Sequence, residues 1–166
     1  MSTLLLETPE VSRNKSGMDN QIPKLRRTER SLPIALLRAR ERVMGPIRDM
    51  LASSGINEQK WRVLRVVDEQ GPLEQTAIAE AACLLLPSLT RILRNMEEEG
   101  LLTRHPDALD RRKSIVTLTD SGRALIAAHA PQSGALLTRL EQKFGATKLN
   151  ELLNLLEDLR RLDLSD

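Results

Sequence analysis

Arginine side chains gather in two short segments whose chemistry suits nucleic acid. One pair, Arg91 and Arg94, lies in an amphipathic stretch of the chain. The other pair, Arg111 and Arg112, lies in a polar loop. A guanidinium group can donate two hydrogen bonds to guanine in the major groove, or bind phosphate oxygens along the backbone. Both segments are therefore candidate DNA contacts, and the elements that carry them decide whether they act together.

The stretch 87–99 has the pattern of an amphipathic helix. Pro87 suits the first turn of a helix, and Gly100 suits the position after its end. The apolar residues at helical spacing, which we expect to pack into the domain, are Leu89, Ile92, Leu93 and Met96. The outward polar residues, which we expect to contact DNA, are Ser88, Thr90, Arg91, Arg94 and Asn95. Arg91 is the expected base reader and Arg94 a phosphate contact, whereas the alternative is an ordinary solvated helix face.

The second basic segment lies between two short segments, 101–104 and 114–118, that predict a two-stranded hairpin. At the tip of such a hairpin, Arg111 and Arg112 can reach the minor groove, whose negative potential attracts guanidinium groups. Asp110 cannot itself favour DNA, so its expected role is to orient a neighbouring arginine through a carboxylate–guanidinium hydrogen bond. The alternative is a surface salt bridge of little consequence.

Helices are predicted before these two segments and must position them. Helical periodicity predicts a helix over 31–55, with a kink or a break near Pro46. Two further helices are predicted, one from Asn57 to Gly71 and a short one over about 74–82. A tight helix pair followed at once by a basic hairpin is typical of a winged helix-turn-helix.

Two more helices are predicted after the hairpin. Thr119 is expected to begin a long helix that bends near Pro131, and Thr147 is expected to cap the last helix. Leucines recur in this last helix at a spacing typical of helix–helix contacts: Leu149, Leu152, Leu156 and Leu159. A monomer would leave these leucines and the apolar first helix in water, so we expect the chain ends to interlock in a homodimer.

The predicted fold class is mainly α with a small β-hairpin, that is, a winged helix-turn-helix with N- and C-terminal dimerisation helices. The predicted parts are a flexible basic tail (1–30), a dimerisation helix (31–55), a winged DNA-binding lobe (56–120) and C-terminal dimerisation helices (121–166).

The chain resembles the MarR family of transcriptional regulators over about residues 31–163. The stretch 87–104 is similar to that family's recognition helix and first wing strand, and 107–119 is similar to its wing. The resemblance implies a dimeric repressor that binds double-stranded DNA and is released by a small ligand, and it pairs Asp110 with Arg112. Further similarity, at 34–41 and 58–65, points to a subgroup of repressors that control the degradation of an aromatic acid.

Arg40 is the expected ligand-binding residue, because its helical spacing places it along the apolar stripe of the first helix. A charge at that position is costly unless it is paired. The partner is either an acidic group of the protein or the carboxylate of an aromatic acid, which matches a guanidinium with two hydrogen bonds. Trp61 can form a wall of such a pocket or simply belong to the core, and Arg38 and Arg62 are weaker candidates.

Cys83 supports an alternative in which the protein senses oxidants. A reactive thiol needs a lowered pKa and access to solvent. The apolar neighbours of Cys83 predict instead that it is buried.

Composition narrows the remaining function classes. The 166 residues carry a net charge of +2 and include two His and one Cys, so no nucleophile triad or zinc cluster is visible. We therefore expect no enzyme, no cofactor and no metal. No membrane helix or secretory signal is apparent, and the single cysteine suits the cytoplasm. A winged helix that binds protein is an alternative, but it has no need of a basic wing.

Overall fold

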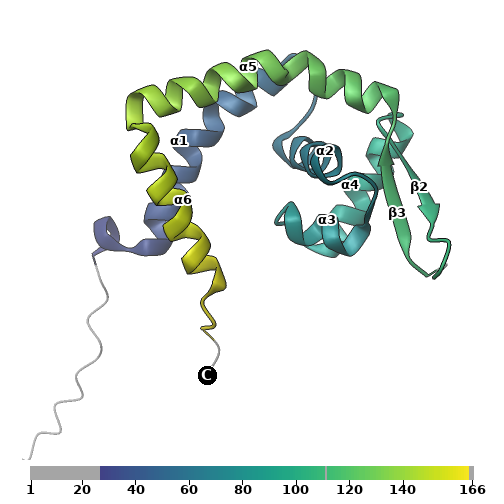
Figure 1. Ribbon diagram of the computed structural model, residues 1–166, viewed down its shortest axis with the longest axis horizontal. Coiled ribbons are helices and arrows are strands. Elements are labelled where there is room, and N and C mark those ends of the chain that lie inside the picture. The colour runs from purple at the N-terminus through teal and green to yellow at the C-terminus, as the bar shows by residue number, and fades with distance from the viewer. Residues whose placement is uncertain (1–26, 111, 165–166) are drawn as a thin grey trace, which may run out of the picture. The chain divides into compact units, whose positions relative to one another are not determined.

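The computed structural model describes residues 27–164 except residue 111 (Figure 1). Contacts divide the chain into two units, one ending at Leu37 and the other beginning at Arg38. The elements in chain order are a 3-10 helix (Thr28–Arg30), α1 (Leu32–Ala52), α2 (Glu58–Gln70), β1 (Leu73–Glu74), α3 (Gln75–Ala81), α4 (Leu86–Glu98), β2 (Leu102–Pro106), β3 (Ser114–Leu118), α5 (Asp120–Phe144) and α6 (Ala146–Arg161). The fold is mainly helical, as predicted.

The core of the winged lobe is formed by α2, α3, α4 and the sheet. The periodic apolar positions of α4 are all buried, so its polar face points away from the core. Full burial of each such side chain contributes about 1.5–3 kcal/mol to folding. The largest fully buried side chains of the lobe are Val63, Leu64, Ile78, Leu89, Leu93, Met96, Leu102 and Val116.

The wing is part of a three-stranded antiparallel sheet in the order β1-β3-β2. Val116 of the central strand pairs with Leu73 on one side and with Arg104 on the other. The two-residue strand β1 is too short to show an alternation of apolar and polar residues, so the sequence predicts only the hairpin of β2 and β3. Because β1 leads directly into α3, this extra strand links the wing to the first helix of the helix-turn-helix.

Capping residues fix where two helices begin. The Asn57 side chain accepts a hydrogen bond from the Lys60 N–H at 2.9 Å, and Thr119 accepts one from the Gly122 N–H at 3.1 Å. These contacts satisfy N–H groups that lack a partner within the helix. The predicted cap at Thr147 is wrong, because α6 begins one residue earlier, after Gly145, whose φ of 96° suits glycine.

Both helices that contain an internal proline are continuous. Pro46 lies inside α1 and Pro131 lies inside α5. Of the two alternatives predicted near Gly45, a kink or a break, the break is therefore wrong. A proline removes one backbone hydrogen bond, and the bonds on either side keep the helix intact. The predicted tail, 1–30, lies outside the described residues except for 27–30, which include the short 3-10 helix.

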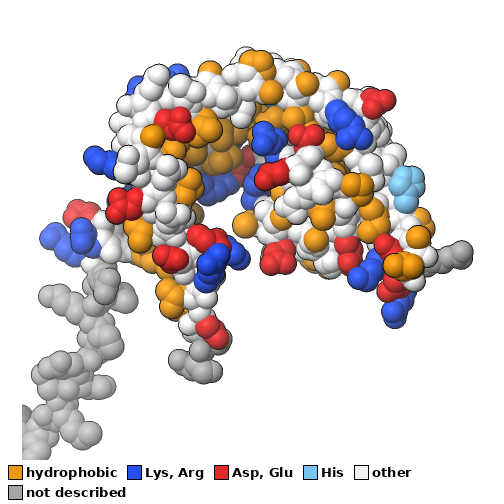
Figure 2. Space-filling view, viewed as in Figure 1, with side chains coloured by type: hydrophobic (Ala, Val, Ile, Leu, Met, Phe, Trp, Pro, Cys, Tyr) orange, Lys and Arg blue, Asp and Glu red, His pale blue; other side chains and the backbone are white. Residues whose placement is uncertain are grey.

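The last helix carries apolar side chains that the chain itself leaves uncovered. None of its residues is buried, and hydrophobic side chains lie on the surface along α6 (Figure 2). Its most exposed leucines are Leu152, Leu153, Leu155 and Leu156.

Among the described residues no single helix is long and apolar enough to cross a membrane. The bent pair α3–α4 is long and apolar enough when its two helices are taken together.

Candidate nucleic-acid interface

Helix α4 separates its apolar and polar residues sharply. Arg91 and Arg94 are exposed, and Ser88 and Asn95 are half-buried at the edges of the polar face. The Arg94 guanidinium lies 3.5 Å from the Glu98 carboxylate one turn later. Arg91 forms no ion pair with any other described residue. Of the two arginines, Arg91 is therefore the one whose charge the protein leaves uncompensated.

The Thr90 hydroxyl is already engaged inside the lobe. It donates a hydrogen bond to the Leu86 carbonyl at 3.0 Å and accepts one from the Gln75 side-chain amide. Because both functions of the hydroxyl are used, Thr90 holds the first residue of α3 against α4. The sequence placed Thr90 on the outward face but did not reveal this link, since Gln75 lies 15 residues away.

The wing tip contains the predicted pair between Asp110 and Arg112. The Asp110 carboxylate accepts hydrogen bonds from the Arg112 guanidinium at 3.1 and 3.3 Å, and from the Arg112 backbone N–H at 3.1 Å. The side-chain hydrogen bond from Arg112 lowers the pKa of Asp110, because it stabilises the carboxylate. The Arg112 side chain remains 92% exposed. Arg111 lies outside the described residues.

Two further ion pairs hold the wing on the lobe, and the sequence did not single them out. Arg104 of β2 donates two hydrogen bonds to the Glu97 carboxylate of α4, at 2.8 and 2.5 Å, which lowers the pKa of Glu97. Lys113 lies 3.0 Å from Glu74 at the end of β1. Both guanidinium nitrogens donate to one Glu97 oxygen, and the Arg104 backbone N–H donates to the other at 3.2 Å, so the wing and α4 are joined by a charge-assisted pair. The acidic run that contains Glu97 was the only feature of the sequence that could have indicated these ion pairs.

The structure shows Arg40 paired with acidic groups of the protein. Arg40 forms ion pairs with Glu58, the first residue of α2, and with Glu41 at 2.8 Å. Arg48 joins the same cluster, at 2.6 Å from Glu41 and 3.3 Å from Glu58. Of the two alternatives drawn from the sequence, the structure shows the internal ion pair.

The other residues predicted to bind a ligand differ in their surroundings. Trp61 is buried in the core, with its ring edge-on to His129 at 5.7 Å between ring centroids. Arg62 donates a hydrogen bond to the Ala82 carbonyl at 2.7 Å, at the end of α3. Arg38 is exposed on α1.

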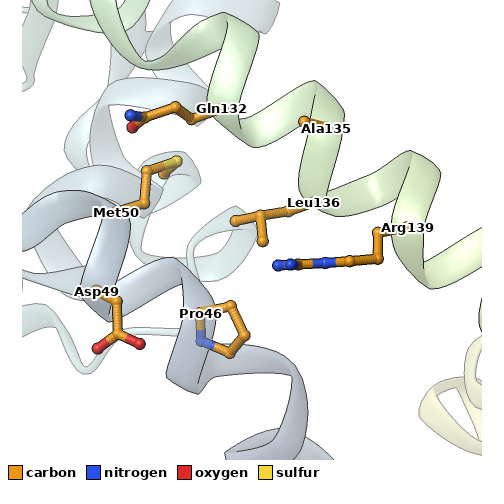
Figure 3. Close-up of a pocket in the computed structure, with 7 residues that line it drawn as sticks. All are labelled: Pro46, Asp49, Met50, Gln132, Ala135, Leu136 and Arg139. Carbon is orange, nitrogen blue, oxygen red and sulfur yellow. The ribbon is translucent and has the colours of Figure 1, made fainter.

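A pocket of about 460 Å³ lies between α1 and α5, and the sequence did not predict it. Its lining is mostly apolar, and its polar groups are Asp49, Gln132 and Arg139. The Arg139 side chain extends from α5 toward Pro46 of α1 (Figure 3). Arg139 has no ion pair with another described residue. The pocket has a volume and a composition common among sites for small organic ligands.

Cys83 corrects one sequence expectation. The residue is exposed, not buried, and its φ of 50° places it in the left-handed region between α3 and α4. Of its apolar neighbours, Ala82 is buried in the core and Leu84 packs against it, whereas Leu85 and Leu86 are exposed. In the part of the chain that the structure describes, no cluster of His, Cys, Asp or Glu could hold a metal ion.

An exposed basic helix and a basic wing on one lobe define a winged helix-turn-helix DNA-binding protein. The sequence pattern of the MarR family matches residues 56–114. The homoprotocatechuate degradative operon repressor of Escherichia coli is 38% identical over 128 residues, which are 77% of this chain and 86% of that protein. The chain belongs to the MarR family: it is a DNA-binding transcriptional regulator and not an enzyme.

Solved structures of regulators share this fold over most of the chain. NadR in complex with 4-hydroxyphenylacetate is 31% identical, with a TM-score of 0.75 over 84% of this chain and 99% of NadR. The repressor CouR, bound to a 23-mer DNA duplex, is 30% identical, with a TM-score of 0.72 over 80% of this chain and 94% of CouR. These relatives bind an aromatic acid and DNA, respectively.

Proposed function

We propose that the protein is a cytoplasmic, homodimeric repressor of an operon for aromatic-acid catabolism, released from a palindromic operator by a small aromatic carboxylate. The observation that carries its DNA-binding part is the exposure of Arg91 on α4 and of Arg112 on the wing of the same lobe. The DNA contacts in this proposal are Ser88, Thr90, Arg91, Arg94, Asn95, Asp110, Arg111 and Arg112.

The proposed contacts divide into base reading and backbone binding. Arg91 reads a base edge, because its guanidinium has no acidic partner to displace among residues 27–164 apart from 111. Arg94 binds phosphate, since its pair with Glu98 already directs it along the helix surface. Arg112 enters the minor groove, oriented by Asp110. As a DNA contact, Thr90 gives up its hydrogen bond with Gln75 or its hydrogen bond with the Leu86 carbonyl.

Two copies are needed for this mode of binding. One recognition helix and one wing cover a small site, and a two-fold axis lets two of them read a palindrome. The uncovered leucines of α6 are the surface that the proposal assigns to the partner subunit.

The ligand in this proposal is an aromatic carboxylate. NadR binds 4-hydroxyphenylacetate, and the homoprotocatechuate repressor controls a degradative operon. The pocket between α1 and α5 offers Arg139 as a partner for a carboxylate and apolar side chains for an aromatic ring. Arg40 is a second candidate, but a carboxylate must displace Glu58 to reach it. Arg38, Trp61 and Arg62 do not line this pocket.

Release follows from differential affinity. A ligand lowers the affinity for DNA if it binds more tightly when the spacing of the two recognition helices does not match the operator. The free energy lost from DNA binding is the difference between the ligand's binding free energies for the two spacings. A tenfold effect on DNA affinity needs about 1.4 kcal/mol.

The test of the DNA-binding part starts with selection of bound duplexes from a random pool. Affinity for the selected duplex and for random duplex is then measured for wild type, Arg91→Ala and Arg94→Ala. Arg91→Ala is expected to reduce the preference for the selected duplex about tenfold, since a bidentate base contact gives about 1–3 kcal/mol of discrimination. Arg94→Ala is expected to weaken binding to both duplexes equally. It should also reduce the salt slope, that is, the slope of log affinity against log salt concentration, by about one. Equal losses on both duplexes for Arg91→Ala would contradict its base-reading role.

A further inference from the structure

The wing tip presents an apolar side chain to solvent. Leu109 is 98% exposed, more than any other large hydrophobic residue that the structure describes. Its side chain therefore makes almost no contact within the chain and contributes little to the stability of the fold. Apolar surface in water is unfavourable, so a covering partner would gain from contact with it.

Hydrogen bonds hold the backbone that projects Leu109. The Asp107 carboxylate accepts one from the Leu109 N–H at 2.7 Å and one from the Asp110 N–H at 2.9 Å. These backbone hydrogen bonds lower the pKa of Asp107, so the carboxylate stays charged at neutral pH. Two backbone hydrogen bonds close the hairpin below the tip, from Asp107 to the Lys113 carbonyl at 3.0 Å and from Lys113 to the Asp110 carbonyl at 2.8 Å.

The charges around the tip indicate what covers Leu109. Arg112 and Lys113 lie within four residues of it and are exposed. Arg112 pairs with Asp110 and Lys113 with Glu74, but the Arg112 side chain is 92% exposed, so its guanidinium can reach the negative potential of the minor groove. The walls of that groove are formed by deoxyribose rings, which offer C–H groups to an apolar side chain. Proteins that bind the minor groove frequently place leucine and other apolar side chains there. The minor groove offers a negative potential for Arg112 and C–H groups for Leu109 side by side. We therefore favour the minor groove over an acidic protein surface as the partner of the tip.

We propose that Leu109 is a DNA contact that packs against the deoxyribose walls of the minor groove beside Arg112. This inference rests on the proposed function, because it requires the wing to enter that groove. Leu109 would then supply affinity that does not depend on counterion release, in contrast to the arginines of the same tip. It would also favour sequences whose minor groove opens readily, since a leucine needs more width than a guanidinium.

The test compares L109S with A108S as a matched control at the neighbouring exposed position, and with R112A as a charge variant. Both serine variants should fold as the wild type does, because neither replaced side chain is packed. Affinity for one selected duplex is measured by fluorescence anisotropy between about 50 and 200 mM salt. We expect L109S to lose about tenfold in affinity at every salt concentration, which leaves the salt slope unchanged. A108S should bind like the wild type, and R112A should reduce the slope by about one.

A second measurement locates the contact. Hydroxyl radicals attack deoxyribose from the minor groove, so L109S should lose protection at the sugars that the wing covers. Wild-type affinity of L109S would overturn the inference. A changed salt slope for L109S would also overturn it, because Leu109 would then act through the arginines. So would a changed oligomeric state of L109S on size-exclusion chromatography, since a second protein copy would then be the partner. Failure of R112A to alter either affinity or slope would instead overturn the placement of the wing in the proposed function.

Discussion

Arginines in this protein differ in whether the fold compensates their charge. Arg40 shares Glu58 and Glu41 with Arg48, so its guanidinium is satisfied before any ligand arrives. Arg139 lines the pocket between α1 and α5 without a described ionic partner. A carboxylate ligand gains a new pair at Arg139 but only exchanges one pair for another at Arg40. The net free energy of binding therefore favours Arg139.

Substitution of each arginine separates these two candidates. We expect Arg139→Ala to weaken the binding of 4-hydroxyphenylacetate at least tenfold, because a charge-assisted hydrogen bond contributes about 1.5–3 kcal/mol. Arg40→Ala should change affinity by less than about threefold, since exposed pairs of this kind are worth about 0–1 kcal/mol. Isothermal titration calorimetry on the full-length protein measures both affinities. The opposite ranking of the two variants would restore Arg40 as the carboxylate site.

Residue roles were predictable from sequence only where both partners lie close together in the chain. Asp110 was expected to orient a neighbouring arginine, and the family resemblance implied that this arginine is Arg112, two residues away. Glu58 lies 18 residues from Arg40, so which of the two alternatives holds depended on how α1 packs against α2. The exposure of Cys83 was missed for a similar reason, because apolar neighbours indicate a core only when another element covers them.

At the scale of elements, the start of α5 fits closely against the wing. Gly122 in its first turn is buried, and a Cβ atom there would lie 2.2 Å from the Leu101 carbonyl oxygen. The contacting atom belongs to the backbone that leads into β2, so it cannot move aside as a flexible side chain does. The spacing between wing and long helix therefore requires glycine at this position.

Gly122→Ala should destabilise the protein by about 1–3 kcal/mol through overpacking. Gly134→Ala is the matched control in the same helix, where a Cβ would meet nothing within 4 Å. It should stabilise the fold by about 0.5–1 kcal/mol, because alanine loses less entropy in a helix than glycine does. Chemical denaturation followed by circular dichroism measures the free energy of unfolding of both variants. Equal effects of the two substitutions would show that the contact with Leu101 relaxes at little cost.

The helices and the hairpin were predicted well because their signals are local. Apolar periodicity, the Asn57 and Thr119 caps and the glycines after helices all act within one or two turns. The strand β1 was missed because two residues carry no period, and it exists only through its pairing with β3. The pocket between α1 and α5 was missed because the residues that line it from the two helices are more than 80 positions apart in sequence.

At the scale of the whole molecule, the uncovered leucines of α6 are the surface that we propose joins two subunits. Four leucines within five residues, 152–156, are exposed, with Leu153 at 55% and Leu155 at 59%. No contact within the described chain accounts for them. A second copy that covers them would remove apolar surface from water and fix the distance between two recognition helices.

A charge on this surface should therefore separate the subunits. We expect Leu153→Asp to raise the dimer dissociation constant at least 100-fold, because an unpaired carboxylate is costly to bury in an apolar interface. Asn154→Asp is the matched control, since it adds the same charge at the exposed position next in sequence. Analytical ultracentrifugation should give a monomer for Leu153→Asp at concentrations where wild type and Asn154→Asp are dimers. Operator affinity should fall with dimer content, because a monomer can contact only one half-site. If Leu153→Asp stayed dimeric and bound the operator normally, α6 would not be the face that joins the subunits.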